Sequence, residues 1–227
     1  MPRTARIAPG GVCFHVLNRG VLRQTLFRSH KDYLAFLAAL RETLEAMPTM
    51  RLLAFCLMPN HWHLVLWPRR DGELTAFVRW LTHTHTMRWH THYHTLGTGH
   101  LYQGRYKSFP VECDDHLYSL LRYVERNALR AGLVKKAENW RWSSLSRRQA
   151  EDSPTLLHPW PVPMPKDWLA QVQAPQTEAE LEAVRRSVAR GCPYGNTGWQ
   201  ERTARRLGLE HTLRRRGRPK KAEQPRG

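Results

Sequence analysis

The alternation of apolar and polar residues predicts the secondary structure of the N-terminal part of the chain. Residues 12–18 alternate as a half-buried strand does, and residues 30–47 open with polar residues and then carry apolar ones at helical spacing. Two further strands are expected at 50–57 and 61–67. Because the turn signal Pro59-Asn60 separates them, we expect these two strands to form a hairpin.

The same kind of pattern continues through the middle of the chain. Residues 73–94 have helical periodicity, and residues 101–112 alternate loosely as one strand or a pair of short strands. A helix capped by Asp114 or Asp115 follows and runs to about Arg130. The order β-α-β-β-α-β-α predicts an α+β fold, a ferredoxin-like sandwich with an antiparallel sheet. Parallel-sheet folds alternate strand and helix more strictly and are the less favoured alternative.

The composition changes in the last third of the chain and suggests three regions. We expect one domain that carries the chemistry over residues 1–148. A proline-rich linker or wrapping segment is expected over 149–176, and a basic helical extension and tail over 177–227. Within the extension the pattern predicts two short helices, at 177–190 and 197–207.

The charge of the chain indicates a polyanionic partner. Its 227 residues carry a formal net charge of +17, and the sequence pI is about 10.6. Since neutralising phosphates releases condensed counterions, a domain this basic usually meets nucleic acid; the alternative is a surface that is basic only for solubility. The four cysteines are far apart and are expected to be reduced thiols. No apolar run approaches the roughly 20 residues that span a bilayer, so we expect a cytoplasmic protein with no membrane partner.

Two histidines on the third predicted strand form the sharpest candidate for chemistry. His61 and His63 are two residues apart, so both imidazoles point to the same face of the strand while Trp62 points to the other. Two imidazoles on one face make half of a site for a divalent metal. Taken alone, a structural histidine pair is equally expected.

The helix that follows the last predicted strand carries a polar stripe. Tyr123 and Asn127 are four residues apart and therefore lie on one face, to which Arg130 returns. The stripe lies beside the apolar side of the same helix, so we expect it to face a polar group or a polar ligand. The alternative is a surface stripe whose tyrosine packs only by its ring.

Two basic features are weaker candidates for binding nucleic acid. Arg105 and Lys107, on one face of a predicted strand, could hold phosphate; an ordinary basic edge strand explains them equally well. Arg216 and Arg218 flank a glycine in a sequence similar to the AT-hook core, which binds a narrow minor groove. A basic tail without that specificity is the alternative.

Several motifs in order resemble one family across nearly the whole chain. MPNHWHLVLWP, GRYKS and YVERNALRAGLV are similar to the IS200-like HUH transposases that use a single catalytic tyrosine, and more closely to the REP-associated tyrosine transposases. One departure is Ala128, where such sequences usually have proline after the asparagine. The motifs that carry the resemblance are NRG at 18–20, MPNHWHLVLWP at 58–68, GRYKS at 104–108, YVERNALRAGLV at 123–134, WRWSS at 140–144 and the basic stretch at 202–221.

The resemblance implies a catalytic transposase domain with the HUH endonuclease fold and a role for each candidate residue. His61 and His63 match the histidine–hydrophobic–histidine motif that binds Mg²⁺ or Mn²⁺, and Asn127 matches the third metal ligand. Tyr123 matches the nucleophile. The implied function is a metal-dependent single-strand DNA endonuclease and strand transferase that acts on hairpin, REP-like palindromic DNA through a 5′-phosphotyrosine intermediate.

The resemblance also sets expectations about partners and leaves alternatives. We expect single-stranded DNA hairpins as the partner, a location at the bacterial nucleoid, and a monomer, with a dimer as the second choice. One alternative is a DNA-binding regulator that has lost catalysis, and another is a nicking enzyme of the relaxase or replication-initiator type. A histidine-triad phosphohydrolase is disfavoured because Val65 stands where its third histidine is needed.

Overall fold

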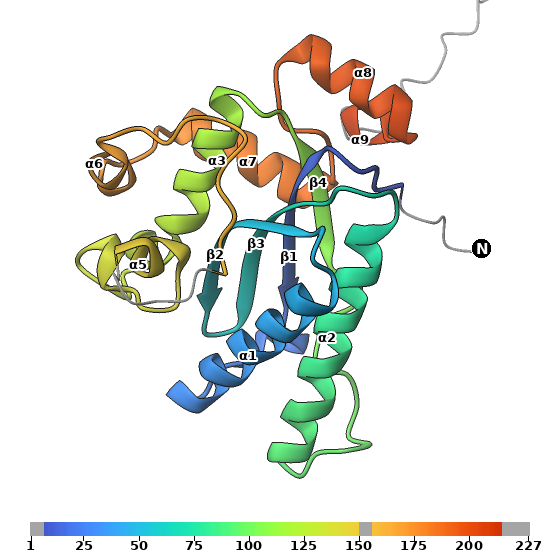
Figure 1. The fold of residues 1–227 in the computed structure, drawn as a ribbon, viewed down its shortest axis with the longest axis vertical. Coiled ribbons are helices and arrows are strands. Elements are labelled where there is room, and N and C mark those ends of the chain that lie inside the picture. Colours follow the sequence, from blue (N-terminus) through green and yellow to red (C-terminus); the bar gives the residue numbers. More distant parts are fainter. Residues whose placement is uncertain (1–6, 150–155, 215–227) are drawn as a thin grey trace, which may run out of the picture.

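The computed structural model of the protein describes residues 7–149 and 156–214. Within these residues the centre is a four-stranded sheet in the order β2-β3-β1-β4, and all neighbouring strands are antiparallel (Figure 1). Because α1 links β1 to β2 and α2 links β3 to β4, the order is βαββαβ and the predicted ferredoxin-like α+β fold is confirmed. These elements are β1 (Cys13–Arg19), α1 (His30–Ala46), β2 (Arg51–Met58), β3 (His61–Trp67), α2 (Glu73–His92) and β4 (Lys107–Val111).

Short helices make up the rest of the described chain. The two helices predicted in the C-terminal extension are present as α7 and α8. Asn196 caps α8 by accepting a hydrogen bond from the backbone N–H of Trp199 at 3.0 Å. The remaining elements are η1 (Val21–Arg23), α3 (Asp115–Glu125), α4 (Asn127–Arg130), η2 (Ala137–Asn139), α5 (Ser144–Gln149), α6 (Trp168–Gln173), α7 (Glu178–Arg190), α8 (Thr197–Leu207) and α9 (Glu210–Leu213).

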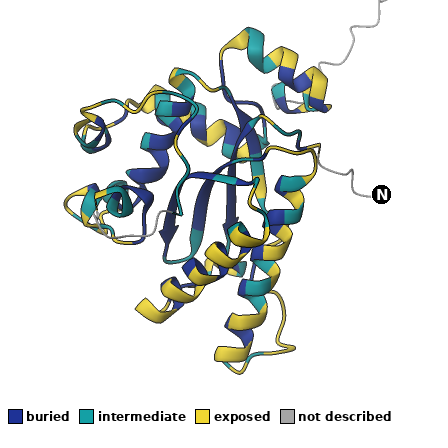
Figure 2. Ribbon diagram, in the orientation of Figure 1, coloured by how far each residue is buried: buried dark blue, intermediate teal, exposed yellow. Residues whose placement is uncertain are grey.

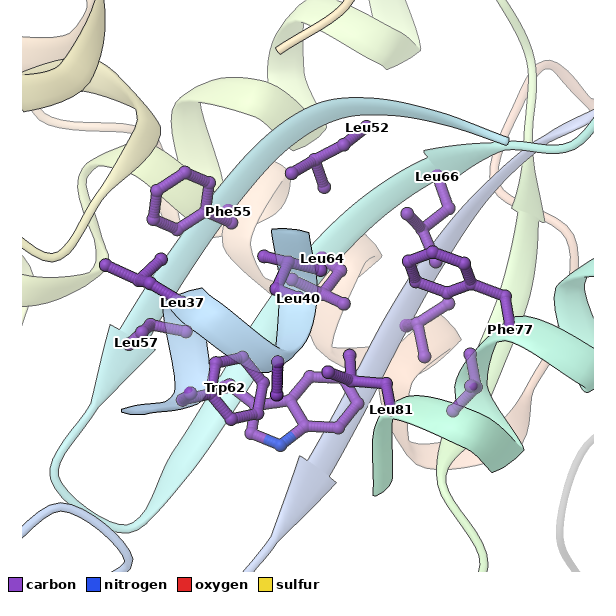
Figure 3. Packing of buried hydrophobic residues seen from close by; sticks show 14 of the residues in the cluster. Leu37, Leu40, Leu52, Phe55, Leu57, Trp62, Leu64, Leu66, Phe77 and Leu81 are labelled. Atoms are coloured by element: carbon purple, nitrogen blue, oxygen red, sulfur yellow. The ribbon is translucent and has the colours of Figure 1, made fainter. Parts of the chain in front are cut away.

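One face of the sheet is covered by α1 and α2. Trp62 of β3 is fully buried there, and burial of roughly 200 Å² at about 25 cal/mol per Å² contributes about 5 kcal/mol before entropy is counted. Its indole N–H donates to the Tyr102 hydroxyl at 3.0 Å, so the buried polar atom is satisfied. Figure 3 shows this layer, in which the labelled residues are Leu37, Leu40, Leu52, Phe55, Leu57, Trp62, Leu64, Leu66, Phe77 and Leu81.

The opposite face of the sheet packs against the helices that follow β4. Val65 of β3 and Phe109 of β4 lie in one apolar cluster with Leu120 and Val124 of α3. The strands are therefore buried on both faces, whereas the outer sides of α1 and α2 are exposed (Figure 2). The polar side chains of β3 on this second face, His61 and His63, therefore lie on the side of the sheet that α3 covers.

The helix predicted to run from Asp114 or Asp115 to Arg130 is divided in the structure. Asp114 is the cap, and it accepts a hydrogen bond from the backbone N–H of His116 at 2.9 Å. α3 ends at Glu125, and α4 begins after Arg126, whose ψ of −3° departs from the helical value. Tyr123 and Asn127 thus lie on either side of a tightened turn.

The proline-rich segment at 149–176 wraps around the sheet domain where it is described. The indole N–H of Trp160 donates to the carbonyl oxygen of Leu53 on β2 at 3.0 Å. The indole of Trp168 donates to the Glu125 carboxylate at 2.7 Å, and the segment contains α6, which the sequence pattern does not predict. The division of the chain into domains at 148/149 and 176/177 stays a prediction. None of the described helices is long and apolar enough to cross a bilayer.

Candidate active site

His61 and His63 share one face of β3, as their spacing predicts. Their ring centroids are 5.0 Å apart, while Trp62 between them is buried in the opposite layer. In the register with β1, His63 lies opposite Leu17 and His61 lies opposite Arg19. The pair is therefore on the face that α3 covers, at the end of the sheet where β1 ends.

Both imidazoles use Nδ1 for their hydrogen bonds, so Nε2 of each ring has no side-chain partner within the described residues. His61 Nδ1 is 2.6 Å from the Asn60 side-chain oxygen, which can only accept, so Nδ1 carries the proton and Nε2 keeps its lone pair. His63 Nδ1 is 2.8 Å from Nε2 of His15 on the neighbouring strand. When His63 donates in this pair, its Nε2 also keeps a lone pair. Such outer partners fix the tautomer of metal-binding histidines.

The electrostatic environment keeps these rings neutral at pH 7. Burial lowers the pKa of His61 to about 4, and the charges of Arg19 and Arg130 contribute to that shift. Burial, followed by the neighbouring histidines and arginines, holds the pKa of His63 well below its usual range. Burial also lowers the pKa of His15 to about 3. Since metal ions bind neutral imidazole, these residues fit a divalent cation without first losing a proton.

Tyr123 faces the histidine pair from α3. Its ring centroid is 5.9 Å from that of His63, with the two rings nearly perpendicular. Only 9% of the residue is exposed, and within the described chain its hydroxyl has no hydrogen-bond partner. The guanidinium of Arg130 lies 4.1 Å from the centre of the Tyr123 ring and donates to the Tyr123 carbonyl at 3.3 Å. The structure thus brings Tyr123 and Arg130 together with His63.

Asn127 lies at the start of α4 and is buried. α4 packs against β2, and Cys56 of β2 lies opposite His63 in the sheet. Asn127 is therefore in the layer that covers the site. Within the described chain its side-chain amide has no hydrogen-bond partner and is joined to neither imidazole.

The predicted DNA-binding residues are spread over different parts of the chain. Arg130 is at the site itself, whereas Arg105 and Lys107 are exposed at the neighbouring edge of the sheet. Arg105 precedes β4 and Lys107 begins it, so they are not on one strand as expected. Arg216 and Arg218 fall outside the described residues.

Three residues of this site are not singled out by the sequence pattern alone. They are His15, which supports His63, Asn60, which orients His61, and Arg19, which lies opposite His61. The alternation of the first strand does place His15 and Arg19 on one face, a signal that could have suggested them. Their connection to the histidine pair depends on strand register, which local patterns do not specify.

A second group of possible metal ligands lies elsewhere. Ligand atoms of Glu112, Asp114 and His116 are all within 4.8 Å of one another. Glu112 follows the end of β4 that pairs with Cys13, so this group is at the opposite end of the sheet from His61. Both carboxylate oxygens of Glu112 also accept hydrogen bonds from Asn196. This cluster is separate from the histidine pair.

Comparison with known proteins adds the family. Residues 11–127 match the family model described as "Transposase IS200 like", which is 117 of the 227 residues. The chain belongs to the IS200-like transposase family. Transposases of this family cleave DNA strands and transfer them during transposition, and they are metal-dependent in general. The matched region of this transposase includes both histidines, Tyr123 and Asn127.

Solved structures agree in fold. A REP-associated tyrosine transposase bound to a REP hairpin has a TM-score of 0.54 at 20% identity, over 73% of this chain and 96% of that chain. At this identity the likeness shows the fold alone. A candidate transposase from Deinococcus radiodurans R1 has a TM-score of 0.40 at 17% identity, over 56% of this chain and 97% of that chain, which is too distant to carry weight. No curated protein matches the chain.

Proposed function

We propose that this transposase is a metal-dependent single-strand DNA endonuclease and strand transferase that forms a 5′-phosphotyrosine bond through Tyr123. One observation carries the proposal: the free hydroxyl of Tyr123 belongs to a ring 5.9 Å from His63, whose own ring is 5.0 Å from that of His61. The hydroxyl that we propose as the nucleophile and the two neutral imidazoles that we propose as metal ligands therefore lie in one layer of the molecule.

His61 and His63 would hold the cation, Mg²⁺ or Mn²⁺, and the side-chain oxygen of Asn127 would be the third ligand. The support is that both imidazoles are neutral at pH 7, and that the Asn127 amide has no other partner in the described chain. When bound, a divalent cation supplies positive charge to a phosphate oxygen and stabilises the charge that builds up during displacement.

Tyr123 would attack the scissile phosphorus directly. The phenol releases its proton to solvent water as the tyrosine oxygen–phosphorus bond forms, and the bond from phosphorus to the 3′ oxygen breaks. That oxygen leaves and takes up a proton to become a free 3′-OH, while the 5′ side of the DNA stays on the protein. A second 3′-OH can then displace Tyr123 and join strands without ATP. Arg130 would hold the Tyr123 ring through its stacked guanidinium.

The DNA partner we propose is single-stranded DNA that carries a hairpin. The solved REP-associated transposase is bound to a REP hairpin, and the present chain carries a formal charge of +17. Arg130 lies at the site, and Arg105 and Lys107 line a pocket together with Arg19, which lies opposite His61, so all three would contact phosphates. We propose that Arg216 and Arg218 of the tail add to affinity, and that the protein acts as a monomer at the bacterial nucleoid.

The alternatives are less well supported by the geometry. A relaxase or replication initiator often uses three histidines on its metal, but the third histidine here, His15, is turned toward His63 and occupies the Nδ1 side of that ring. A regulator without catalysis would have no need of a tyrosine hydroxyl left free beside two neutral imidazoles. A nuclease assay separates these classes.

The test is cleavage of a labelled DNA hairpin with single-stranded flanks. We expect the wild-type protein to cut it with Mn²⁺ or Mg²⁺ and to stop in excess EDTA. His61→Ala and His63→Ala should each lose cleavage and retain hairpin binding. His83→Ala serves as the matched control because His83 is an exposed histidine of α2. Cleavage in EDTA, or full activity of both site variants, would contradict the proposed function.

A further inference from the structure

A pocket of about 270 Å³ lies next to the histidine pair, and the chemistry described above assigns no ligand to it. It is bounded by the end of β1, by the segment that precedes β4 and by α7. Three of its lining residues are cations, Arg19, Arg105 and Lys107, and none of its described lining residues is acidic. Pockets for drug-sized ligands have volumes of roughly 300 to 1,000 Å³, so this slightly smaller pocket suits a group no larger than about one nucleotide.

Arg19 has the most unusual environment of the three cations. Its Nε atom is buried and has no hydrogen-bond partner, and the rest of its guanidinium donates to no residue within the described chain. A buried polar group of a protein is nearly always paired, and an arginine more so because it is charged. An unpaired guanidinium at the wall of a pocket therefore indicates that the ligand supplies the acceptor.

The position of Arg19 connects the pocket to the catalytic face. Arg19 lies directly opposite His61 in the antiparallel register, so both side chains leave the sheet on the same side. Its charge acts on the His61 ring, because it is one of the causes that lower the pKa of that histidine. A phosphate bound to Arg19 from the pocket would thus be a neighbour of the phosphate bound at the histidines.

The wall of the pocket is fixed in advance by backbone pairing. Gly20 pairs with Tyr102, and the backbone N–H of Gln103 donates to the carbonyl oxygen of Arg19 at 2.9 Å. Lys107 is paired with Leu17 farther along β1. The intervening residues 104–106 therefore leave the sheet and return to it within a short loop, which holds Arg105 at the mouth of the pocket.

We infer that this pocket binds the nucleotide next to the cleaved phosphodiester, with the Arg19 guanidinium on the phosphate of that nucleotide. Arginine suits this role because its donors match phosphate oxygens and remain charged at every relevant pH. Val188 of α7 contributes to the pocket as well, so the subsite includes a residue outside the part of the chain that matches the family model. This inference rests on the proposed function.

The test measures binding and needs no catalysis. The protein carries Tyr123→Phe and is free of metal, and the probe is a DNA hairpin with single-stranded flanks. Each flank phosphate is replaced in turn by a neutral methylphosphonate. We expect the replacement of one phosphate next to the cleaved position to lower the affinity roughly 10-fold or more, which is the range of a hydrogen bond to a charged group. When Arg19→Ala is added, the replacement of that phosphate should no longer lower the affinity, and the effects of replacing the other phosphates should stay unchanged.

Two further variants keep the result interpretable. Arg19→Lys should restore part of the loss at the same phosphate, whereas Arg88→Ala should leave the whole profile unchanged because Arg88 is paired with Glu42 on the opposite side of the sheet. An unchanged profile with Arg19→Ala, or an equal loss at every phosphate, would overturn the inference. Failure of the wild-type protein to cut DNA would instead overturn the proposed function, since the binding profile does not depend on cutting.

Discussion

The orientation of His61 by the turn residue before it gives a sharp prediction. The Asn60 side-chain oxygen is 2.6 Å from His61 Nδ1, and its own amide nitrogen donates to the Arg23 carbonyl at 3.3 Å, so the acceptor is held in place. Asn60→Ala removes the acceptor and lets the neutral ring place its proton on Nε2, the nitrogen that must bind metal. Loss of such an outer partner typically weakens metal affinity about 10- to 100-fold, or roughly 1.4 to 2.8 kcal/mol.

The assay is titration with Mn²⁺, by calorimetry or by the electron spin resonance signal of free Mn²⁺. Asn139→Ala is the matched control, because Asn139 is an exposed asparagine of η2. We expect the dissociation constant to rise for Asn60→Ala alone, and the Mn²⁺ concentration for half-maximal cleavage to rise with it. Equal Mn²⁺ affinity of Asn60→Ala and the wild type would refute the idea that this amide orients the ligand.

Three further predictions concern stability and DNA affinity. Burial lowers the pKa of His85 to about 3, so below pH 6.5 the unfolded chain takes up a proton that the folded chain does not, and the free energy of unfolding falls. His85→Phe should reduce this fall between pH 7.5 and 5.5 by about 1.4 kcal/mol in urea unfolding, and an unaltered fall would contradict the prediction. Trp168→Phe leaves the buried Glu125 carboxylate without one donor and should cost about 1 to 3 kcal/mol in the same assay, and a change below about 0.5 kcal/mol would speak against it. Residues 215–227 contain six Arg or Lys and one Glu. Their deletion should reduce the slope of log affinity for hairpin DNA against log salt by roughly one unit for each phosphate that the tail neutralises, and an unchanged slope would show that the tail does not touch DNA.

The features predicted correctly from sequence are those set by local periodicity. Alternation in residues 12–18 and 61–67 identifies two strands of the sheet, and the period of two places His61 and His63 on one face. The turn signal between the second and third strands likewise identifies the hairpin. Each of these patterns depends only on neighbours within a few residues, so a short stretch of sequence is enough to predict the strand or the turn.

The features that local patterns miss depend on partners far away in the chain. α6 forms in a proline-rich stretch where Trp168 reaches Glu125, a contact that local composition does not reveal. The predicted helix is interrupted at Arg126, whose side chain donates to the carbonyl oxygen of Val172 at 2.9 Å, another contact that local composition does not reveal. His15 becomes part of the site only through the pairing of β1 with β3.

The position of the C-terminal helices changes how the basic tail should be tested. A deletion that begins at residue 201 is reasonable from sequence, since the stretch is polar and basic, but it would cut α8 at a point where Ala204 and Leu207 are buried. The deletion from 215 leaves both α8 and α9 intact. It therefore separates a loss of charge from a loss of folded structure.

The covalent bond between Tyr123 and the 5′ phosphate of the DNA can be detected directly. The wild-type protein is incubated with Mn²⁺ and a hairpin oligonucleotide, the adduct is isolated under denaturing conditions and digested, and the modified peptide is sequenced by mass spectrometry. We expect a 5′-phosphorylated nucleotide on Tyr123 and no adduct with Tyr123→Phe. An adduct on another tyrosine, or cleavage by Tyr123→Phe at the wild-type rate, would contradict this expectation.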